Sequence, residues 1–250
     1  MDRFQHAVRI EHVRLRQAVN AMTVLVATML MLLATSPLAI AAEITAPSRN
    51  GSFTARLVMT STITTRPGAG RKLARLNPAT QPATLMALGE TTRSGRRYIK
   101  VLVSKRGRRD GWIPASRVVL AFQPWFIELV RDTRRLTMFY RGRAVIRTTV
   151  VVGAPDTPTP LGLHAVHHIT KNSSSSLLGP FTIQLTAFSP VLHEFAGGPG
   201  RIALHGMRGA LVVPPGSAVS HGCVRVRNRV LRRIAKRVRG GVPVYIHRQR

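Results

Sequence analysis

The stretch Ser220–Arg225 reads SHGCVR and holds Cys223, the only cysteine in the 250-residue sequence. His221 stands two positions before this cysteine, and Arg225 stands two positions after it. A second histidine, His205, lies upstream at the end of a short apolar run. One thiol and two imidazoles in so short a span predict a cysteine nucleophile with a histidine base.

This chemistry requires the Cys223 thiol to lose its proton. An ordinary cysteine has a pKa of about 8.5, so little of it is thiolate at neutral pH. Because a nearby imidazole or guanidinium favours the thiolate, we expect an ionised Cys223. Gly222 has no Cβ and lets the backbone approach a substrate. The amides of Gly222 and Cys223 are candidates to face a developing oxyanion.

Two alternatives remain open at this level. Either His205 or His221 fits the role of the base, since cysteine and histidine partners meet in space rather than in sequence. Cys223 also fits the description of a small buried residue with no chemical role.

The same residues carry a resemblance. His205-Gly206, followed by Ser220–Val226 and then Asn228, is similar to the signature of the L,D-transpeptidase (YkuD-like) catalytic domain, a family of cell-wall enzymes with a cysteine nucleophile. The likeness extends from about Trp125 to the C-terminus. It implies a mostly β fold, in which an L,D-transpeptidase-type β-sandwich carries a C-terminal helix.

The resemblance also implies roles for individual residues. Cys223 would be the nucleophile, and His205 the general base and acid, oriented by the backbone carbonyl of Gly206. His221 would shape the oxyanion site, and Arg225 would order the loop or receive a substrate carboxylate. The remaining candidates for supporting positions are Ser220, Gly222, Thr159, Pro160 and Gly162.

The reaction that the resemblance implies is the cross-linking of peptidoglycan stem peptides in cell-wall biogenesis, and thereby a part in cell shape. Cys223 would attack a tetrapeptide stem, release the terminal D-alanine and pass the acyl group to an amine. Acyl transfer of this kind needs no metal and no organic cofactor. We also keep an L,D-carboxypeptidase with the same nucleophile and a non-enzymatic cell-wall-binding protein as alternatives.

The charge of the chain points to anionic partners. It contains 38 Lys and Arg against 9 Asp and Glu, a formal net charge of +29. Such an excess favours nucleic acid, a membrane surface or an acidic polymer. Only 5% of the residues are aromatic, which argues against a surface of stacked bases. Together with the resemblance to cell-wall enzymes, which implies peptidoglycan stem peptides as partners, this charge leads us to expect anionic cell-wall polymers and no nucleic acid.

Residues 1–42 read as a targeting segment. A basic start is followed by an apolar stretch at 21–34 and by small residues near Ala41 and Ala42. This pattern predicts a signal peptide, and an uncleaved N-terminal membrane anchor is the alternative. Either form exports the chain to the outer side of the cytoplasmic membrane, with membrane contact only through this segment. An unpaired cysteine in an exported protein is a candidate reactive thiol.

The rest of the chain divides into three parts. Residues 43–53 form a polar linker, residues 54–121 a first domain and residues 122–250 the catalytic domain. In the first domain, Thr65–Gly68 and Asp110–Val118 are similar to parts of bacterial SH3-like domains. This likeness implies a small β-barrel that docks wall peptides or braces the enzyme.

Several local elements follow from the pattern of the catalytic half. Short polar links at 131–134 and 141–143 predict β-hairpins, and 144–152 reads as one strand. Asn228 is expected to cap a helix that runs to about Arg239. On a strand, His164 and His168 would share one face and His167 the other. We interpret these three as partly exposed strand histidines rather than metal ligands.

Overall fold

The computed structural model describes residues 43–79, 83–107, 110–195 and 197–249. The predicted signal peptide or anchor at 1–42 lies outside these ranges. Within them, no helix has both the length and the apolar character needed to cross a membrane. The described chain is mostly β, as expected, and consists of two large sheets, one pair of short strands and one short α-helix.

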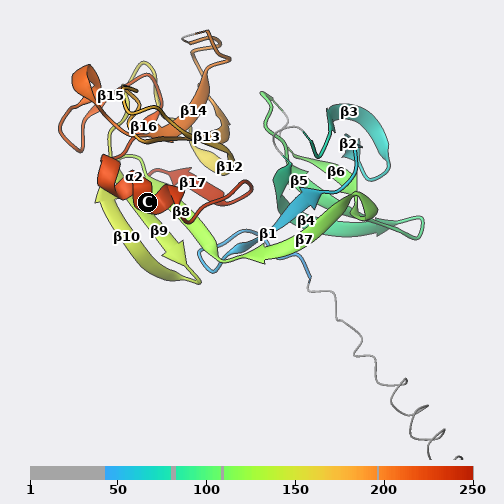
Figure 1. Cartoon of the computed structure of the whole chain (residues 1–250). Helices are drawn as coiled ribbons and strands as arrows, with labels where there is room; N and C mark the ends of the chain where they lie inside the picture. The colour runs from blue at the N-terminus through green and yellow to red at the C-terminus, as the bar shows by residue number, and fades with distance from the viewer. Residues whose placement is uncertain (1–42, 80–82, 108–109, 196, 250) are drawn as a thin grey trace, which may run out of the picture. The chain divides into compact units, whose positions relative to one another are not determined.

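The first sheet contains seven strands in the order β3-β2-β6-β5-β4-β1-β7, and every pairing in it is antiparallel. Figure 1 shows it in blue to green. Its strands are β1 (Ser52–Leu57), β2 (Ser61–Arg66), β3 (Ala69–Leu76), β4 (Thr84–Arg93), β5 (Arg96–Leu102), β6 (Asp110–Pro114) and β7 (Val118–Gln123), with a 3-10 turn η1 (Ala115–Arg117) before β7. Ile63, Ile99 and Ile113 are fully buried in its own core. The SH3-like resemblance stays a prediction.

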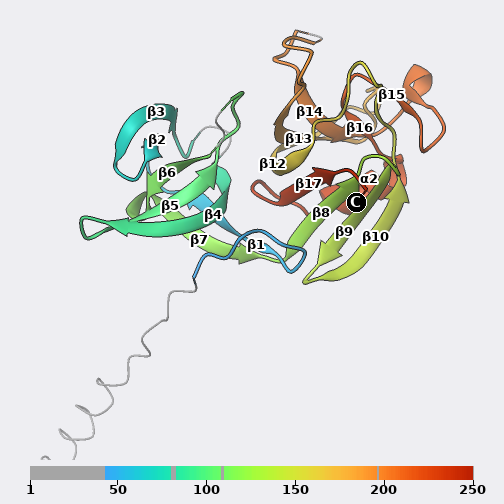
Figure 2. The ribbon, with the colours of Figure 1, turned by 180° about the vertical axis from the view of Figure 1, so that it is seen from behind.

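The second sheet contains eight strands in the order β10-β9-β8-β17-β12-β13-β14-β16. Its elements are β8 (Trp125–Val130), β9 (Arg135–Tyr140), β10 (Arg143–Thr149), β12 (Gly162–Lys171), β13 (Phe181–Phe188), β14 (Arg201–His205), β16 (Val224–Arg225) and β17 (Pro243–His247). The last strand, β17, runs parallel to β8 and antiparallel to β12, so the C-terminal segment joins the two halves of the sheet. Figure 2 shows this neighbourhood of β8, β17 and β12 from behind.

Both predicted hairpins are present, but the strand expected at 144–152 is interrupted. β10 ends at Thr149, and the separate strand β11 (Val152–Gly153) pairs in parallel with β15 (Ala218–Ser220). Between them, Val151 exchanges backbone hydrogen bonds of 3.0 and 2.9 Å with Arg225. The chain leaves the edge of the sheet because its backbone groups find partners in the SHGCVR stretch instead.

The helix α2 (Asn228–Ala235) is shorter than expected and begins differently. The Asn228 side chain caps no helical amide. Its Oδ1 accepts from the Met207 amide at 2.9 Å, and its Nδ2 donates to the Met207 carbonyl at 2.9 Å. Asn228 therefore ties the helix start to the segment after His205, which is a tertiary role that local capping rules do not predict.

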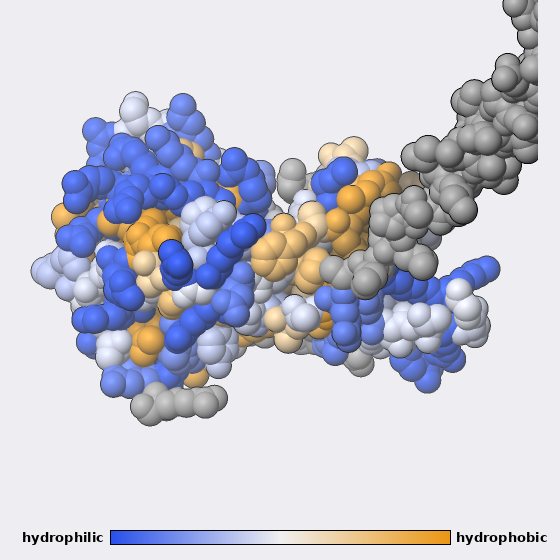
Figure 3. All heavy atoms as spheres, turned by 90° about the horizontal axis from the view of Figure 1, so that it is seen from below, coloured by the Kyte–Doolittle hydropathy of each residue, from blue (hydrophilic) through white to orange (hydrophobic). Residues whose placement is uncertain are grey.

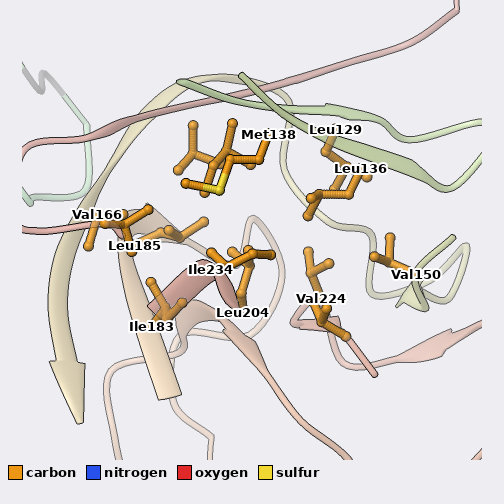
Figure 4. Close-up of a cluster of buried hydrophobic side chains, with 14 of the residues drawn as sticks. Leu129, Leu136, Met138, Val150, Val166, Ile183, Leu185, Leu204, Val224 and Ile234 are labelled. Atoms are coloured by element: carbon orange, nitrogen blue, oxygen red, sulfur yellow. The ribbon is translucent and has the colours of Figure 1, made fainter. Parts of the chain in front are cut away.

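A single apolar core lies between the two halves of the second sheet and α2. Figure 4 shows Leu136 and Met138 from β9, Leu185 from β13 and Ile234 from α2 pointing toward one another. All four are almost completely shielded from solvent. This burial stabilises the packing of the helix against the strands of the second sheet.

The surface carries the excess of positive charge. Figure 3 shows one face of the molecule, on which hydrophilic side chains predominate and apolar ones gather in smaller groups and in one broader area. Few carboxylates balance the cations, since the chain has only 9 Asp and Glu. At physiological salt, exposed charges more than about 8 Å apart are largely screened, which weakens the repulsion among these cations.

Replacing Ile234 by alanine should lower the free energy of unfolding by about 2–5 kcal/mol, because it leaves a cavity in this core. Denaturant unfolding followed by circular dichroism measures the change. Val145 on β10 is 42% exposed, so Val145→Thr is a matched control that should change stability by less than about 0.5 kcal/mol. Equal losses in both variants would contradict the assignment of Ile234 to the core.

Candidate active site

Two strand ends bring the predicted residues together. β14 and β16 pair in parallel, with Leu204 opposite Val224 and His205 opposite Arg225. Because side chains alternate along an extended chain, Cys223 and Arg225 lie on the same face as His205. All three line one pocket of about 420 Å³.

The same pocket includes two further predicted residues, Ser220 and His221. The other candidates lie elsewhere. Gly206 follows β14 directly, whereas Pro160 lines a separate cavity of about 220 Å³. Gly162 begins β12, where it pairs with Ile246. Neither Pro160 nor Gly162 therefore lies in the pocket with Cys223.

His205 is held in a defined orientation. Its Nδ1 donates a hydrogen bond of 2.7 Å to the carbonyl oxygen of Gly206, the contact that the resemblance implied. Since a carbonyl only accepts, Nδ1 carries the proton and Nε2 is left as an acceptor. The ring is only 6% exposed. Burial lowers the pKa of His205; the hydrogen bond to Gly206 opposes this shift, and the positive charge of Arg225 adds to it, so the neutral ring is favoured.

Burial acts against the thiolate that the sequence led us to expect at Cys223. Burial raises the pKa of Cys223 above its ordinary value, although the backbone of Ala203 and the charge of Arg225 act in the opposite direction. The sulfur also lies 4.0 Å from the carbonyl oxygen of Arg201, which accepts from a thiol and not from a thiolate. Burial therefore favours the neutral forms of both Cys223 and His205.

A tight turn presents Cys223. The Ser220 hydroxyl donates to the Cys223 carbonyl at 2.6 Å and accepts from the Gly222 amide at 3.2 Å. The Gly222 amide is thus already bonded, so the expectation that it faces an oxyanion is wrong for this structure. Gly222 has φ +108°, and a Cβ there would lie 2.9 Å from Ile202 Cδ1. Glycine is required for the turn rather than for the approach of a substrate.

Two threonines fasten this turn to the loop before β12. Thr159 is fully buried, and its hydroxyl donates to the Gly222 carbonyl at 2.9 Å and accepts from the Gly153 amide at 2.9 Å. Thr157 donates to the Ser220 carbonyl at 2.9 Å. Thr159 thus holds the turn that precedes Cys223. The sequence analysis did not identify Thr157, which binds the same turn. The position of Thr157, two residues before the candidate Thr159, was the feature of the sequence that could have indicated this role.

The two histidines of the motif have different surroundings. His221 is exposed, and its ring stacks on Phe195 with centroids 4.8 Å apart and an interplanar angle of 30°. His205 is the buried imidazole with a fixed tautomer, which favours it as the base. Phe195 belongs to the segment between β13 and β14, which the sequence did not single out.

The histidines of β12 do not follow the expected alternation. A bulge shifts the register between Val166 and His168, so the strict two-residue period fails there. Burial, with Arg201 and His168 adding smaller effects, lowers the pKa of His167 to about 4. Among the described residues, no group of three or more His, Cys, Asp or Glu side chains has an arrangement that could hold a metal ion.

The chain was compared with protein families and with curated proteins. Residues 124–246 match the sequence model of the YkuD family, the L,D-transpeptidase catalytic domain. This segment is therefore similar to an L,D-transpeptidase catalytic domain. No curated protein matches the chain at a significant level.

Three solved structures illustrate the fold neighbours. The catalytic domain of an E. faecium L,D-transpeptidase shares 19% identity over 49% of this chain and 95% of its own, with a TM-score of 0.37. The Bdellovibrio bacteriovorus protein Bd1075 shares 24% over 50% of this chain and 48% of its own, with a TM-score of 0.39. L,D-transpeptidase 3 of Mycobacterium tuberculosis shares 16% over 55% of this chain and 74% of its own, with a TM-score of 0.40.

Replacing Arg225 by glutamine should raise the pKa of Cys223 further. Its positive charge lowers the pKa of the thiol, so its removal makes the thiolate less favourable. The rate of alkylation by iodoacetamide, measured against pH, should therefore rise at higher pH in Arg225→Gln than in the wild type. Arg229→Gln removes an exposed charge from the same segment and is the control, with an unchanged profile. A shift to lower pH in Arg225→Gln would contradict the electrostatic role.

Replacing Thr159 by valine should cost about 1–3 kcal/mol of stability, because it leaves the buried Gly153 amide without an acceptor. The alkylation rate of Cys223 should change at the same time, since the Gly222 carbonyl loses its donor. Denaturant unfolding and thiol labelling measure the two effects. The exposed Thr170 on β12 supplies the matched control Thr170→Val, which should alter neither.

Proposed function

We propose that the protein is a peptidoglycan L,D-transpeptidase that cross-links stem peptides through a thioester on Cys223. The observation that carries this proposal is one pocket that contains the only cysteine and a buried, neutral His205 with its Nδ1 proton fixed on Gly206. The match of residues 124–246 to the L,D-transpeptidase catalytic domain supplies the reaction class.

In the proposed acylation, Nε2 of His205 takes the thiol proton as the sulfur of Cys223 attacks. The sulfur bonds to the carbonyl carbon of the third residue of a tetrapeptide stem, and the amide bond to the terminal D-alanine breaks. His205 returns its proton to the departing amine. An amine from a neighbouring stem then attacks the thioester carbonyl and loses a proton to His205. The carbon–sulfur bond breaks as the new amide bond forms, and His205 returns this proton to the sulfur of Cys223.

A neutral resting pair suits this sequence of steps. The proton moves from sulfur to nitrogen only when the substrate is present, so the thiol is not consumed by oxidants as readily as a thiolate would be. Arg225 then favours the transient thiolate, because its positive charge lowers the pKa of Cys223. With the Gly222 amide engaged by Ser220, we assign the oxyanion contacts to the Cys223 amide and to His221.

The remaining parts of the proposal concern location and partners. The targeting pattern of residues 1–42 supports export, and the net charge of +29 supports attraction to anionic cell-wall polymers. The L,D-carboxypeptidase alternative differs only in that water takes the acyl group. The wall-binding alternative needs no chemistry at Cys223.

Mass spectrometry of the purified protein with a donor tetrapeptide tests the acylation step. The expected adduct equals the donor without its terminal D-alanine and lies on Cys223. Cys223→Ala should form none, and His205→Gln should slow the adduct by about 10²–10⁴-fold, the usual contribution of a positioned base. His221→Gln should have a smaller effect, because His221 is exposed.

Product analysis separates the alternatives. With an acceptor stem present, a cross-linked dimer supports the transpeptidase, and a tripeptide alone supports the carboxypeptidase. An unmodified Cys223 together with wall binding that survives Cys223→Ala would overturn both enzymatic readings.

A further inference from the structure

We propose that Arg106 is a positioning residue for the Cys223 pocket, although it lies outside the matched segment 124–246. It would hold the pocket wall, which we define as Ser189, Leu192, Phe195 and Gly200, all of which line that pocket. The hydrogen bonds of Arg106 are features of the structure. Their effect on catalysis rests on the proposed function.

The Arg106 guanidinium donates to four backbone carbonyls that lie in or beside the pocket wall. Nη1 bonds the Ser189 carbonyl at 2.7 Å. Nη2 bonds the Leu192 and Pro199 carbonyls, each at 2.9 Å, and lies 3.3 Å from the His193 carbonyl. These carbonyls come from both arms of the connection between β13 and β14. A guanidinium is suited to this because its donors form a rigid, planar fork.

The base of the wall is shaped to accept this side chain. The Ser189 amide donates to the Gly200 carbonyl at 2.8 Å, which closes the connection. Gly200 has φ +62°, and a Cβ there would lie 2.1 Å from the Leu192 carbonyl oxygen and 3.0 Å from Nη2 of Arg106. Any larger residue at this position would therefore collide with the wall and crowd the guanidinium.

A second contact attaches the same loop of the first sheet to the site. Ser104, two residues before Arg106, accepts a hydrogen bond from Arg201 of β14, and Arg201 also lines the pocket. The Arg106 and Arg201 guanidinium groups lie 5.1 and 4.6 Å from the ring centroid of Phe188. The loop between β5 and β6 thus contacts both the wall and the strand that carries His205. These elements belong to one compact unit, Glu43–Arg250.

The pocket wall also contacts the stretch Ser220–Arg225, which holds Cys223. Phe195 stacks on His221, two positions before Cys223, and exchanges backbone hydrogen bonds of 2.9 and 3.0 Å with Gly198. Loss of Arg106 would free carbonyls on both arms and allow Phe195 to move, while the Cys223–His205 pair keeps its own hydrogen bonds. The effect should therefore fall on donor binding more than on the chemical step.

The test compares Arg106→Ala, Arg106→Lys and the control Lys105→Ala in the full chain. Lys105→Ala removes one neighbouring positive charge. The Lys105 Nζ donates to the Leu73 carbonyl of the first sheet at 3.4 Å, away from the pocket wall. Hydrogen–deuterium exchange reports on peptides from the wall, and the saturation of Cys223 acylation by the donor tetrapeptide gives KM and the maximal rate. Thermal melting checks that each variant is folded.

We expect exchange in the wall to rise about tenfold and KM to rise about tenfold in Arg106→Ala, with the maximal rate changed less than threefold, in line with the loss of a positioning contact. Arg106→Lys should be intermediate, because an ammonium keeps the charge but lacks the fork. Lys105→Ala should match the wild type. If Arg106→Ala fails to fold, Arg106→Lys against Lys105→Ala carries the same comparison.

Unchanged exchange and unchanged KM in both Arg106 variants would overturn the proposal, and so would an equal effect of Lys105→Ala. Faster exchange with an unchanged KM would also overturn the positioning role. If the wild type forms no adduct at all, the proposed function fails by itself. Hydrogen–deuterium exchange then tests the contacts of Arg106 with the pocket wall by itself. Faster exchange of the wall in Arg106→Ala supports them, and unchanged exchange contradicts them.

Discussion

The site depends on the parallel pairing of β14 with β16. Their hydrogen bonds place His205 opposite Arg225, and the Val226 amide donates to the His205 carbonyl at 2.8 Å. A parallel pair requires a long crossover, and the segment between the two strands supplies it. Because the backbone itself sets the register, a thiol and an imidazole far apart in sequence meet on one face.

The electrostatics of the pocket follow from its burial. Burial disfavours the charged form of every group, so it lowers the pKa of His205 and raises that of Cys223. Both shifts favour the uncharged pair over the thiolate–imidazolium pair. Arg225 lowers both pKa values, which resists protonation of the ring and favours the thiolate. This arrangement fits the proposed role of Cys223, in which the thiol loses its proton only when a donor is bound.

Hydrogen bonds from other elements hold this pair in place. Thr159 fixes the turn from the loop before β12, and Asn228 ties α2 to the backbone beside Gly206. Arg106, in the loop between β5 and β6 of the first sheet, donates hydrogen bonds to backbone carbonyls in and beside the pocket wall. A strong donor such as a guanidinium can satisfy several carbonyls that the chain leaves open between two strands. The first sheet is therefore physically connected to the site, whatever ligand it has of its own.

The sequence by itself determined the mostly β character, the hairpins that flank β9 and the residues of the SHGCVR motif, because alternation, turn residues and residue chemistry are local properties. The family resemblance, rather than any local rule, implied the contact of His205 with the adjacent Gly206. Only the tertiary structure decided the direction in which the pKa of Cys223 shifts, since burial is a property of the whole fold. The same holds for the engaged Gly222 amide, the side chain of Asn228 and the reach of Arg106, because each depends on a partner distant in the chain.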